Sequence, residues 1–309
     1  MNREAKVACV TGGGTAAELM ASAVFALDQV ARLHGLDIQD THVTFGGVAF
    51  ASAAQTVPVA TRAAILGADA VLVAGAEEPA LAEVMSELDL RAQVTRVRFG
   101  HRDDVAFVFP LADASSEWAI DAAFGIAETR SLRLAAVGDE AWAELVDSVA
   151  AEHEDVRVEH LAPRVAVPLA AFNASRFDVV AIARPWAEAV TEIAAAPAAS
   201  RVAAHGLLAG HGPSLFVPSP DGGSALAGHG VVNPSSMLLA AAMMLEHGLD
   251  ATSAGQTLAG AVSAALVDGP QTPDLLQRGA GATTAEFTTR VVGGFQLAYG
   301  NAEFWPGAA

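Results

Sequence analysis

Short apolar segments that are typical of buried strands alternate with helical segments along most of the chain, and this alternation limits the folds open to it. Residues 5–11 predict a strand, Gly12–Gly14 a tight turn, and 16–34 a helix whose apolar residues recur on one face. The same order returns at 132–152 and at 177–196. Strands that alternate with helices form largely parallel sheets with helices on both faces. We therefore expect an α/β fold.

Further segments complete the expected order of elements. Strands are predicted at 42–45, 69–74, 94–99, 104–109, 132–137, 156–160 and 177–183, and helices at 58–67, 78–88, 115–130, 139–152, 185–196, 235–248 and 252–266. We expect Ser235 to cap the helix 235–248 and Gly248 to end it. Glycine, proline and serine are frequent over 206–234, which predicts ordered loops there.

The composition excludes several classes of function. The formal net charge is −18, and so acidic a surface repels a phosphate backbone, so nucleic-acid binding is not expected. No apolar run reaches the roughly 18 residues that a membrane-spanning helix needs. Cys9 is the only cysteine, which excludes an internal disulfide and fits a reducing cytoplasm; its apolar neighbours predict buried packing. We expect a cytoplasmic protein that binds no membrane.

Several segments, in order along the chain, resemble the isopropylmalate and isocitrate dehydrogenase family, most closely isopropylmalate dehydrogenase. The stretch GHGVVNPSSMLLAAAMMLEHGL at 228–249 is similar to the family's cofactor-side loop and buried helix, and it is the most specific match. RFDVVAIARPWAEAVTEIAA at 176–195 is similar to the family's strand and metal-site helix. The segments 10–18, 60–76 and 273–292 resemble further parts of the family's pattern.

The resemblance implies an architecture. Residues 1–88 and 210–309 would form a large lobe on the nucleotide side, and residues 89–209 a smaller central lobe that carries the metal and substrate side. The active-site cleft would lie between the lobes. The central lobe would also form a homodimer, and a hetero-oligomer with a catalytic relative is an alternative.

The acid–base chemistry of the family has no counterpart in this chain. The resemblance implies a lysine as general base and a tyrosine as general acid. Lys6 and Tyr299 are the only residues of those types, and neither falls in the matching segments. Val137–Asp139 stand where the lysine would be, and Phe109–Leu111 where the tyrosine would be. The usual metal-dependent oxidative decarboxylation is therefore expected to be lost.

The metal site is altered in a similar way. Glu188 and Glu192 hold the positions of two family aspartates, one helical turn apart, on one face of a helix. Two solvated glutamates are the plainer interpretation. Arg164 matches the carboxylate that the family takes from the dimer partner, and a guanidinium cannot bind Mg²⁺. We expect no metal, and we predict that Arg164 pairs across the dimer with one of these glutamates at the substrate side.

Other polar residues are candidates for ligand binding. Arg91 matches one of the family's substrate arginines. Arg96, Arg98 and Arg184 could add positive charge, although surface arginines that balance an acidic protein are at least as good an interpretation. His205 and His211 flank a glycine-rich turn and, with Arg184, are the candidate catalytic residues; ordinary loop histidines are the alternative.

The cofactor loop departs furthest from the family. Val217, Pro220 and Ala225 replace its acidic, histidine and aspartate residues. The remaining candidate contacts to a nucleotide are the turn Asp221–Gly222–Gly223–Ser224 and Asn233, which resembles an adenine-contacting asparagine. NAD or NADP binding is therefore expected to be weakened at best.

Three functions remain open at this point, and the sequence does not decide whether the chain is an enzyme. The scaffold could act on a small organic acid in the cleft without hydride transfer. It could instead be a non-catalytic binding or regulatory subunit. It could also be an NAD(P)-dependent dehydrogenase with substituted catalytic residues, but losing a general acid or base costs about 10²–10⁴-fold in rate. We place the first two ahead of the third.

Overall fold

The computed structural model describes residues 4–75, 79–99, 103–196, 203–219, 224–276 and 281–303. The chain divides into two compact units. Met1–Leu88 and Gly212–Ala309 form one, called here the terminal unit, and Asp89–His211 form the other, called the central unit. None of the described helices is long and apolar enough to cross a membrane.

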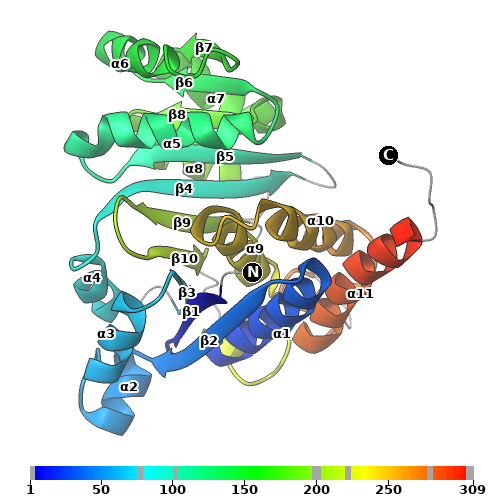
Figure 1. Ribbon diagram of the computed structural model, residues 1–309. Coiled ribbons are helices and arrows are strands. Elements are labelled where there is room, and N and C mark those ends of the chain that lie inside the picture. Colours follow the sequence, from blue (N-terminus) through cyan, green and yellow to red (C-terminus); the bar gives the residue numbers. More distant parts are fainter. Residues whose placement is uncertain are drawn as a thin grey trace. The chain divides into compact units, whose positions relative to one another are not determined.

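The terminal unit contains four parallel strands in the order β2-β1-β3-β10 (Figure 1). Their bounds are β1 (Glu4–Thr11), β2 (Asp37–Thr44), β3 (Ala70–Ala74) and β10 (Ser214–Pro218). The turns after β1 and β3 meet closely: a Cβ on Gly12 would lie 2.9 Å from the Phe45 ring, and Gly75 has φ +84° beside the Gly12 backbone. Glycine at both positions lets two strand ends converge.

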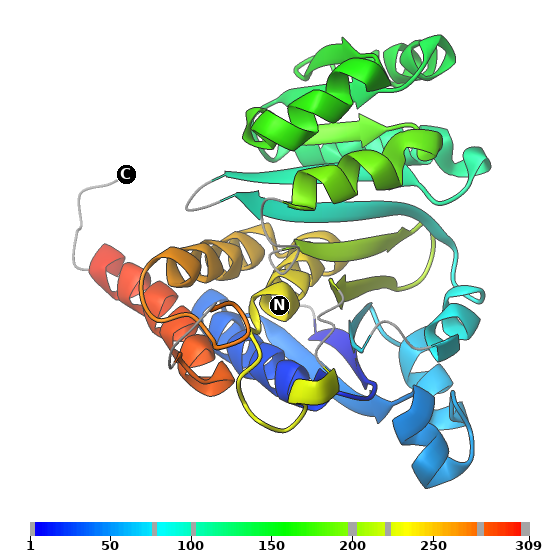
Figure 2. The same ribbon diagram turned by 180° about the vertical axis from the view of Figure 1, so that it is seen from behind.

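Helices surround these strands. One group packs together: α1 (Ala16–His34), α9 (Ser235–Met243), α10 (Thr252–Val267) and α11 (Thr284–Glu303). A second group, α2 (Gly46–Ala53), α3 (Val59–Leu66) and α4 (Pro79–Met85), lies on the side of this unit away from α10 and α11 in both views (Figures 1 and 2). Every residue of α9 is buried, which fits a helix that is apolar on all sides after its first two serines.

The central unit has strand order β9-β4-β5-β8-β6-β7. The long hairpin of β4 (Leu90–Phe99) and β5 (Asp103–Pro110) is antiparallel, and so is the pairing of β4 with β9 (Ala203–Ala209). The other strands, β8 (Val179–Ile182), β6 (Arg133–Val137) and β7 (Arg157–Leu161), continue from β5 in parallel. Both units together confirm the expected α/β class with mostly parallel strands.

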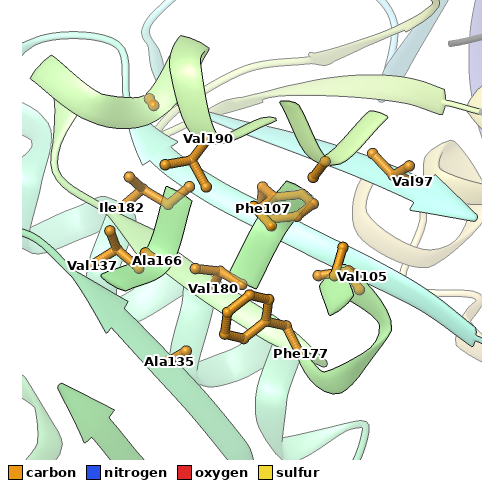
Figure 3. Close-up of a cluster of buried hydrophobic side chains, with 14 of the residues drawn as sticks. Val97, Val105, Phe107, Ala135, Val137, Ala166, Phe177, Val180, Ile182 and Val190 are labelled. Atoms are coloured by element: carbon orange, nitrogen blue, oxygen red, sulfur yellow. The ribbon is translucent and has the colours of Figure 1, made fainter. Parts of the chain in front are cut away.

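Two helix pairs cover this second set of strands. Figure 1 shows α5 (Ser116–Glu128) and α6 (Glu140–Ala150) on one side, and Figure 2 shows α7 (Pro163–Asn173) and α8 (Arg184–Ala195) on the other. A buried cluster fills the space between the strands and α7–α8 (Figure 3). Phe107, Val180, Ile182 and Val190 are among its fully enclosed members. Burial of such side chains contributes about 1.5–3 kcal/mol each.

The structure corrects three expectations. β9 lies partly and β10 wholly within 206–234, where loops were expected; their apolar residues form short buried runs. α7 forms where no element was expected. Pro163 suits the first turn of a helix, but Pro168 in the interior makes the sequence look non-helical. Ser235 is the first residue of α9 and does not cap it; Pro234 is the N-cap residue, and the Ser235 N–H donates to the Asn233 side-chain carbonyl at 2.9 Å.

Candidate functional site

A cluster of three charged or titratable side chains forms where β4 begins and β9 has ended. Asp89 directly precedes β4, and Arg91 lies at an irregularity in the pairing of β4 with β9, between Leu90 and Ala92. Arg91 donates to Asp89 from Nε and Nη2, the latter at 2.9 Å, and His211 Nδ1 lies 3.0 Å from the same carboxylate. The structure therefore brings together two predicted residues, Arg91 and His211, around an aspartate that the sequence analysis did not identify.

Electrostatics and close packing hold this cluster. Hydrogen bonds from Arg91 and then from His211 hold the pKa of Asp89 below its usual range, and the same bond raises the pKa of Arg91. A Cβ on Gly210 would lie 2.2 Å from Arg91 Nε, so glycine is required for the guanidinium to lie here. The cluster is open to solvent, with 86% of the His211 side chain exposed.

His205 has a different environment. It lies on β9 opposite Thr95 of β4, and its Nδ1 is 3.0 Å from Thr95 Oγ1 and 3.3 Å from Gln93 Nε2. An amide nitrogen only donates, so Nδ1 accepts and the ring proton lies on Nε2. Burial lowers the pKa of His205 to about 4. His205 is therefore neutral near pH 7 and a weaker base than an ordinary histidine.

Arg184 begins α8 and faces a 3-10 turn, Asp113–Ser115. Its Nε donates to Asp113 Oδ1 at 2.8 Å and its Nη2 to Oδ2 at 3.2 Å. The bond and charge of Arg184 lower the pKa of Asp113, and Asp113 raises the pKa of Arg184. Arginine guanidinium groups frequently bind carboxylates, including those of ligands, through two such parallel hydrogen bonds. Nothing in the sequence signalled Asp113, because it is distant along the chain.

The metal-site positions lie on the surface of α7 and α8. Glu188 and Glu192 are exposed on α8, and Arg164 is exposed in the first turn of α7. Within the described part of the chain, none of the three forms an ion pair. Two carboxylates one helical turn apart could hold a divalent cation only together with further oxygen ligands from water, a substrate or a second chain.

Two further candidate arginines are buried inside the central unit. Arg96 and Arg98, which sequence analysis treated as extra positive charge, are 7% exposed and pair with Asp104. Arg130 donates to Asp104 at 2.7 Å and to Asp178 at 2.6 Å. Burial alone would raise the pKa of Asp104, but the charges of the three arginines outweigh it and hold that pKa well below its usual range. This ion network links β4 and β5 to the turn after α5, which holds Arg130, and to Asp178, which precedes β8.

The loop before α9, in the terminal unit, is held by several hydrogen bonds. The Gly230 N–H donates to Glu18 of α1 at 3.0 Å, and the Thr284 N–H of α11 donates to the Gly230 carbonyl at 2.8 Å. Gly228 and Gly230 both have positive φ, which explains the glycines of the segment 228–231. Carboxylates normally favour helix N-termini. Glu18 therefore lies near the α1 N-terminus, where the anionic group of a ligand would otherwise bind.

Asn233 is committed to internal contacts. Its Nδ2 donates to Thr272 at 2.9 Å, its Oδ1 accepts from Ser235, and its backbone N–H donates to Asp274. The side chain is buried, so an adenine contact would require it to exchange these partners. Ser224 starts a short 3-10 turn, Ser224–Leu226, and Asp221, Gly222 and Gly223 lie outside the described residues.

The geometry supports anion recognition more directly than redox chemistry. Arg91 and Arg184 already present bidentate or near-bidentate donors to carboxylates, and His211 adds a titratable group beside the first of them. A small acid could replace either aspartate at its arginine. Asn233, in contrast, binds other parts of the chain.

Comparison with known proteins identifies the family. The family model for isocitrate/isopropylmalate dehydrogenase matches residues 120–291. A 3-isopropylmalate dehydrogenase from Streptococcus thermophilus is 26% identical, over 93% of this chain and 98% of that protein. A 3-isopropylmalate dehydrogenase from Bacillus cereus is 28% identical, over 94% of this chain and 96% of that protein.

Solved structures agree on the fold. A β-decarboxylating dehydrogenase from Thermococcus kodakarensis in its apo form has a TM-score of 0.84 and 20% identity, and the match covers 98% of this chain and 100% of that one. Isocitrate dehydrogenase from Methylococcus capsulatus has a TM-score of 0.77 and 19% identity, over 96% and 100% of the two chains. With the family model spanning more than half of its length, the chain belongs to the isocitrate/isopropylmalate dehydrogenase family.

Proposed function

We propose that this protein binds a small organic acid through the arginines of its central unit and acts on it without hydride transfer to a nicotinamide nucleotide. The observation that carries the proposal is the turn between β6 and α6. A Cβ on Gly138 would lie 2.5 Å from Trp142 Cγ, so the Trp142 ring occupies the space of a side chain there. Asp139 then caps α6 by accepting from the Trp142 N–H at 3.0 Å. A lysine at Gly138 would clash with this ring, which supports the proposal that the turn carries no general base.

The position of the general acid supports the same interpretation. Phe109 is 8% exposed and belongs to the buried cluster of the central unit, and Pro110 ends β5. Neither side chain can donate a proton. The Leu111 N–H donates to the Arg91 carbonyl at 2.9 Å, which ties this strand end to the β4 arginine.

The two residues that could supply the missing chemistry lie elsewhere. Lys6 is the third residue of β1 and Thr11 the last, so a rise of about 3.3 Å per residue separates their Cα atoms by roughly 16 Å. Ligands of parallel α/β sheets bind beyond the carboxyl ends of the strands, which is the Thr11 end. Tyr299 lies in α11 of the terminal unit.

An acid ligand would use contacts that the protein already makes internally. Asp89 and Asp113 bind Arg91 and Arg184 as a ligand carboxylate would, and both pairs are largely exposed. Solvent screens such exposed pairs and leaves them weak, so a ligand with two carboxylates can displace the aspartates at low cost. His211 could then exchange a proton with the bound acid.

Calorimetric titration tests the proposal. NAD and NADP are titrated with and without Mg²⁺, followed by 3-isopropylmalate, isocitrate and simpler dicarboxylates, while absorbance monitors nucleotide reduction. We expect acid binding without nucleotide reduction. Arg91→Gln and Arg184→Gln should weaken acid binding, whereas Arg32→Gln, which removes a 73% exposed arginine on α1, should not. Nucleotide binding with oxidation of any of these acids would overturn the proposal.

A second candidate, a non-catalytic subunit of an assembly, is favoured by the exposed surface of α7 and α8. Phe172 is 90% exposed, Val165 44% and Trp186 43%. Large apolar side chains gathered on adjacent helices are typical of protein interfaces. We infer that a second copy of this chain, or a catalytic relative, covers this surface, and that Arg164 from one chain approaches Glu188 and Glu192 of the other. The two functions are compatible with the same dimer.

A further inference from the structure

Three side chains that bind transition metals converge at the edge of the terminal unit's strands. Cys9 lies on β1, and Asp40 and His42 lie on β2, which is the edge strand. The parallel register places Cys9 opposite His42 and Val7 opposite Asp40. Residues two apart on a strand share a face, so all three side chains are on one face. Their ligand atoms lie within 4.8 Å of one another.

The arrangement fits a tetrahedral ion after small side-chain rotations. Bonds of about 2.0–2.3 Å to zinc would place neighbouring ligand atoms roughly 3.3–3.8 Å apart. His42 Nε2 and Asp40 Oδ2 are already 2.7 Å apart. The His42 and Asp40 side chains are 54% and 41% exposed, so an ion can reach them from solvent, whereas Cys9 is buried beneath them.

The space beside the cluster favours a cation. A cavity of about 370 Å³ lies between α1 and the strands, and Cys9 and Asp40 line it. Asp28 and Asp37 also line it, while its one lining cation, Arg32, pairs with Asp28 at 3.0 Å. The charged side chains that line the cavity therefore carry a net negative charge. The cavity also leaves room for a water molecule or small ligand at a fourth coordination position.

The combination of ligands selects the metal. One thiolate, one imidazole and one carboxylate suit a borderline ion, whereas Mg²⁺ and Ca²⁺ prefer oxygen ligands alone. Three protein ligands with an open fourth position are typical of zinc sites that keep a water. We propose that Cys9, Asp40 and His42 bind one Zn²⁺ ion at the edge of the terminal unit. This site is independent of the central-unit arginines and of the function proposed for them.

Cobalt provides a sharp test, because Cys9 is the only cysteine of the sequence. Metal-free, untagged protein is titrated with Co²⁺ under anaerobic conditions. We expect one equivalent to bind with a near-ultraviolet thiolate-to-cobalt charge-transfer band, and Zn²⁺ to displace it. Such a band can come from no other residue. Its absence at saturating Co²⁺ would overturn the proposal.

Variants assign the ligands. Cys9→Ser should abolish the band, and His42→Gln should weaken Zn²⁺ binding more than tenfold, since loss of even an outer-shell partner costs about 10–100-fold. His160→Gln is the matched control, because His160 also bonds an aspartate, Asp147 at 2.8 Å, without a nearby thiol. If the Cys9→Ser protein does not fold, the His42→Gln protein still tests the site, because His42 is exposed. Zn²⁺ affinity that His42→Gln leaves unchanged would contradict the assignment.

Discussion

Trp142 packs directly over Gly138, with the nearest ring carbons 2.5 Å from where a Cβ would be. Replacing Gly138 by alanine should therefore force the buried tryptophan to move and destabilise the fold by about 1–3 kcal/mol. Gly125→Ala is the control: it lies inside α5 with nothing within 4 Å of its Cβ, and it should stabilise by about 0.5–1 kcal/mol. Urea denaturation measures both. Equal stabilities for the two variants would contradict the packing described here.

The ion network around Asp104 should be the most sensitive polar site in the central unit. Asp104→Asn leaves Arg96 and Arg98 buried without their carboxylate and should cost about 3–5 kcal/mol. Asp147→Asn, in a pair whose aspartate is 67% exposed, should cost less than about 1 kcal/mol. Chemical denaturation at neutral pH compares the two. Similar losses would mean that the network contributes nothing beyond a surface pair.

Acid should remove the contribution of Asp104. The folded pKa lies below the ordinary value of 3.8, so the ionised group stabilises the fold fully above that value. The contribution falls as the pH drops from 3.8 towards the lowered folded pKa. The stability difference between wild type and Asp104→Asn should therefore be constant from pH 5 to 7, and it should shrink in stronger acid.

His153 should show the opposite dependence on pH. It stacks on Phe124 with ring centres 4.8 Å apart and lies 2.7 Å from Glu128 and 3.1 Å from Asp121. The bond to Glu128 is the main cause that raises its pKa above 6.5. Its charge stabilises the fold below 6.5, and this contribution is lost as the pH rises through the higher folded pKa. His153→Gln should therefore destabilise more at pH 5.5 than at pH 9.

Nuclear magnetic resonance can follow the His153 ring directly. Glu128→Gln removes the larger of its two carboxylate contacts and should move the His153 pKa back towards 6.5. Asp121→Asn should have a smaller effect, because Asp121 contributes less. A His153 titration midpoint that neither substitution changes would show that the carboxylates do not set the pKa.

The sequence predicted regular elements well where pattern and local chemistry agreed. The helix expected at 16–34 is α1, with the same bounds, because its apolar stripe ends at Gly35 in a left-handed conformation. The strand at 132–137 is β6, shorter by one residue. In both cases a glycine or a polar turn ends an unambiguous apolar period.

Prediction failed where distant contacts decide the structure. The strand expected at 42–45 is β2, but β2 already begins at Asp37 because it pairs with β1 over its whole length, although most of its residues are polar and exposed. The partners of Arg184 and Arg91 could not be found either. Asp113 is distant in sequence from Arg184, and only the folded chain brings His211 to Asp89. A single sequence contains no signal for such contacts.

Association through α7 and α8 can be tested on Phe172. We expect the protein to sediment as a dimer, and Phe172→Glu to shift it towards the monomer, because a charge would be buried in an apolar interface. Val59→Glu is the matched control, since Val59 is 74% exposed on α3 of the terminal unit. A monomeric wild type, or equal sedimentation of the two variants, would contradict this interface.

Replacing Arg164 by aspartate should create a magnesium site if Arg164 of one copy approaches Glu188 and Glu192 of the other. The change turns two carboxylates beside a guanidinium into three carboxylates, an oxygen set that suits Mg²⁺. We expect Arg164→Asp to gain Mg²⁺ binding by calorimetry, while wild type shows none. Arg157→Asp, which adds the same charge at the start of β7, is the control and should gain none. Because the third carboxylate would come from the second copy, the gain should also disappear when Phe172→Glu is added. If the Arg164→Asp protein is a dimer and does not bind Mg²⁺, residue 164 lies away from the two glutamates. If the protein binds Mg²⁺ as a monomer, all three carboxylates belong to one chain.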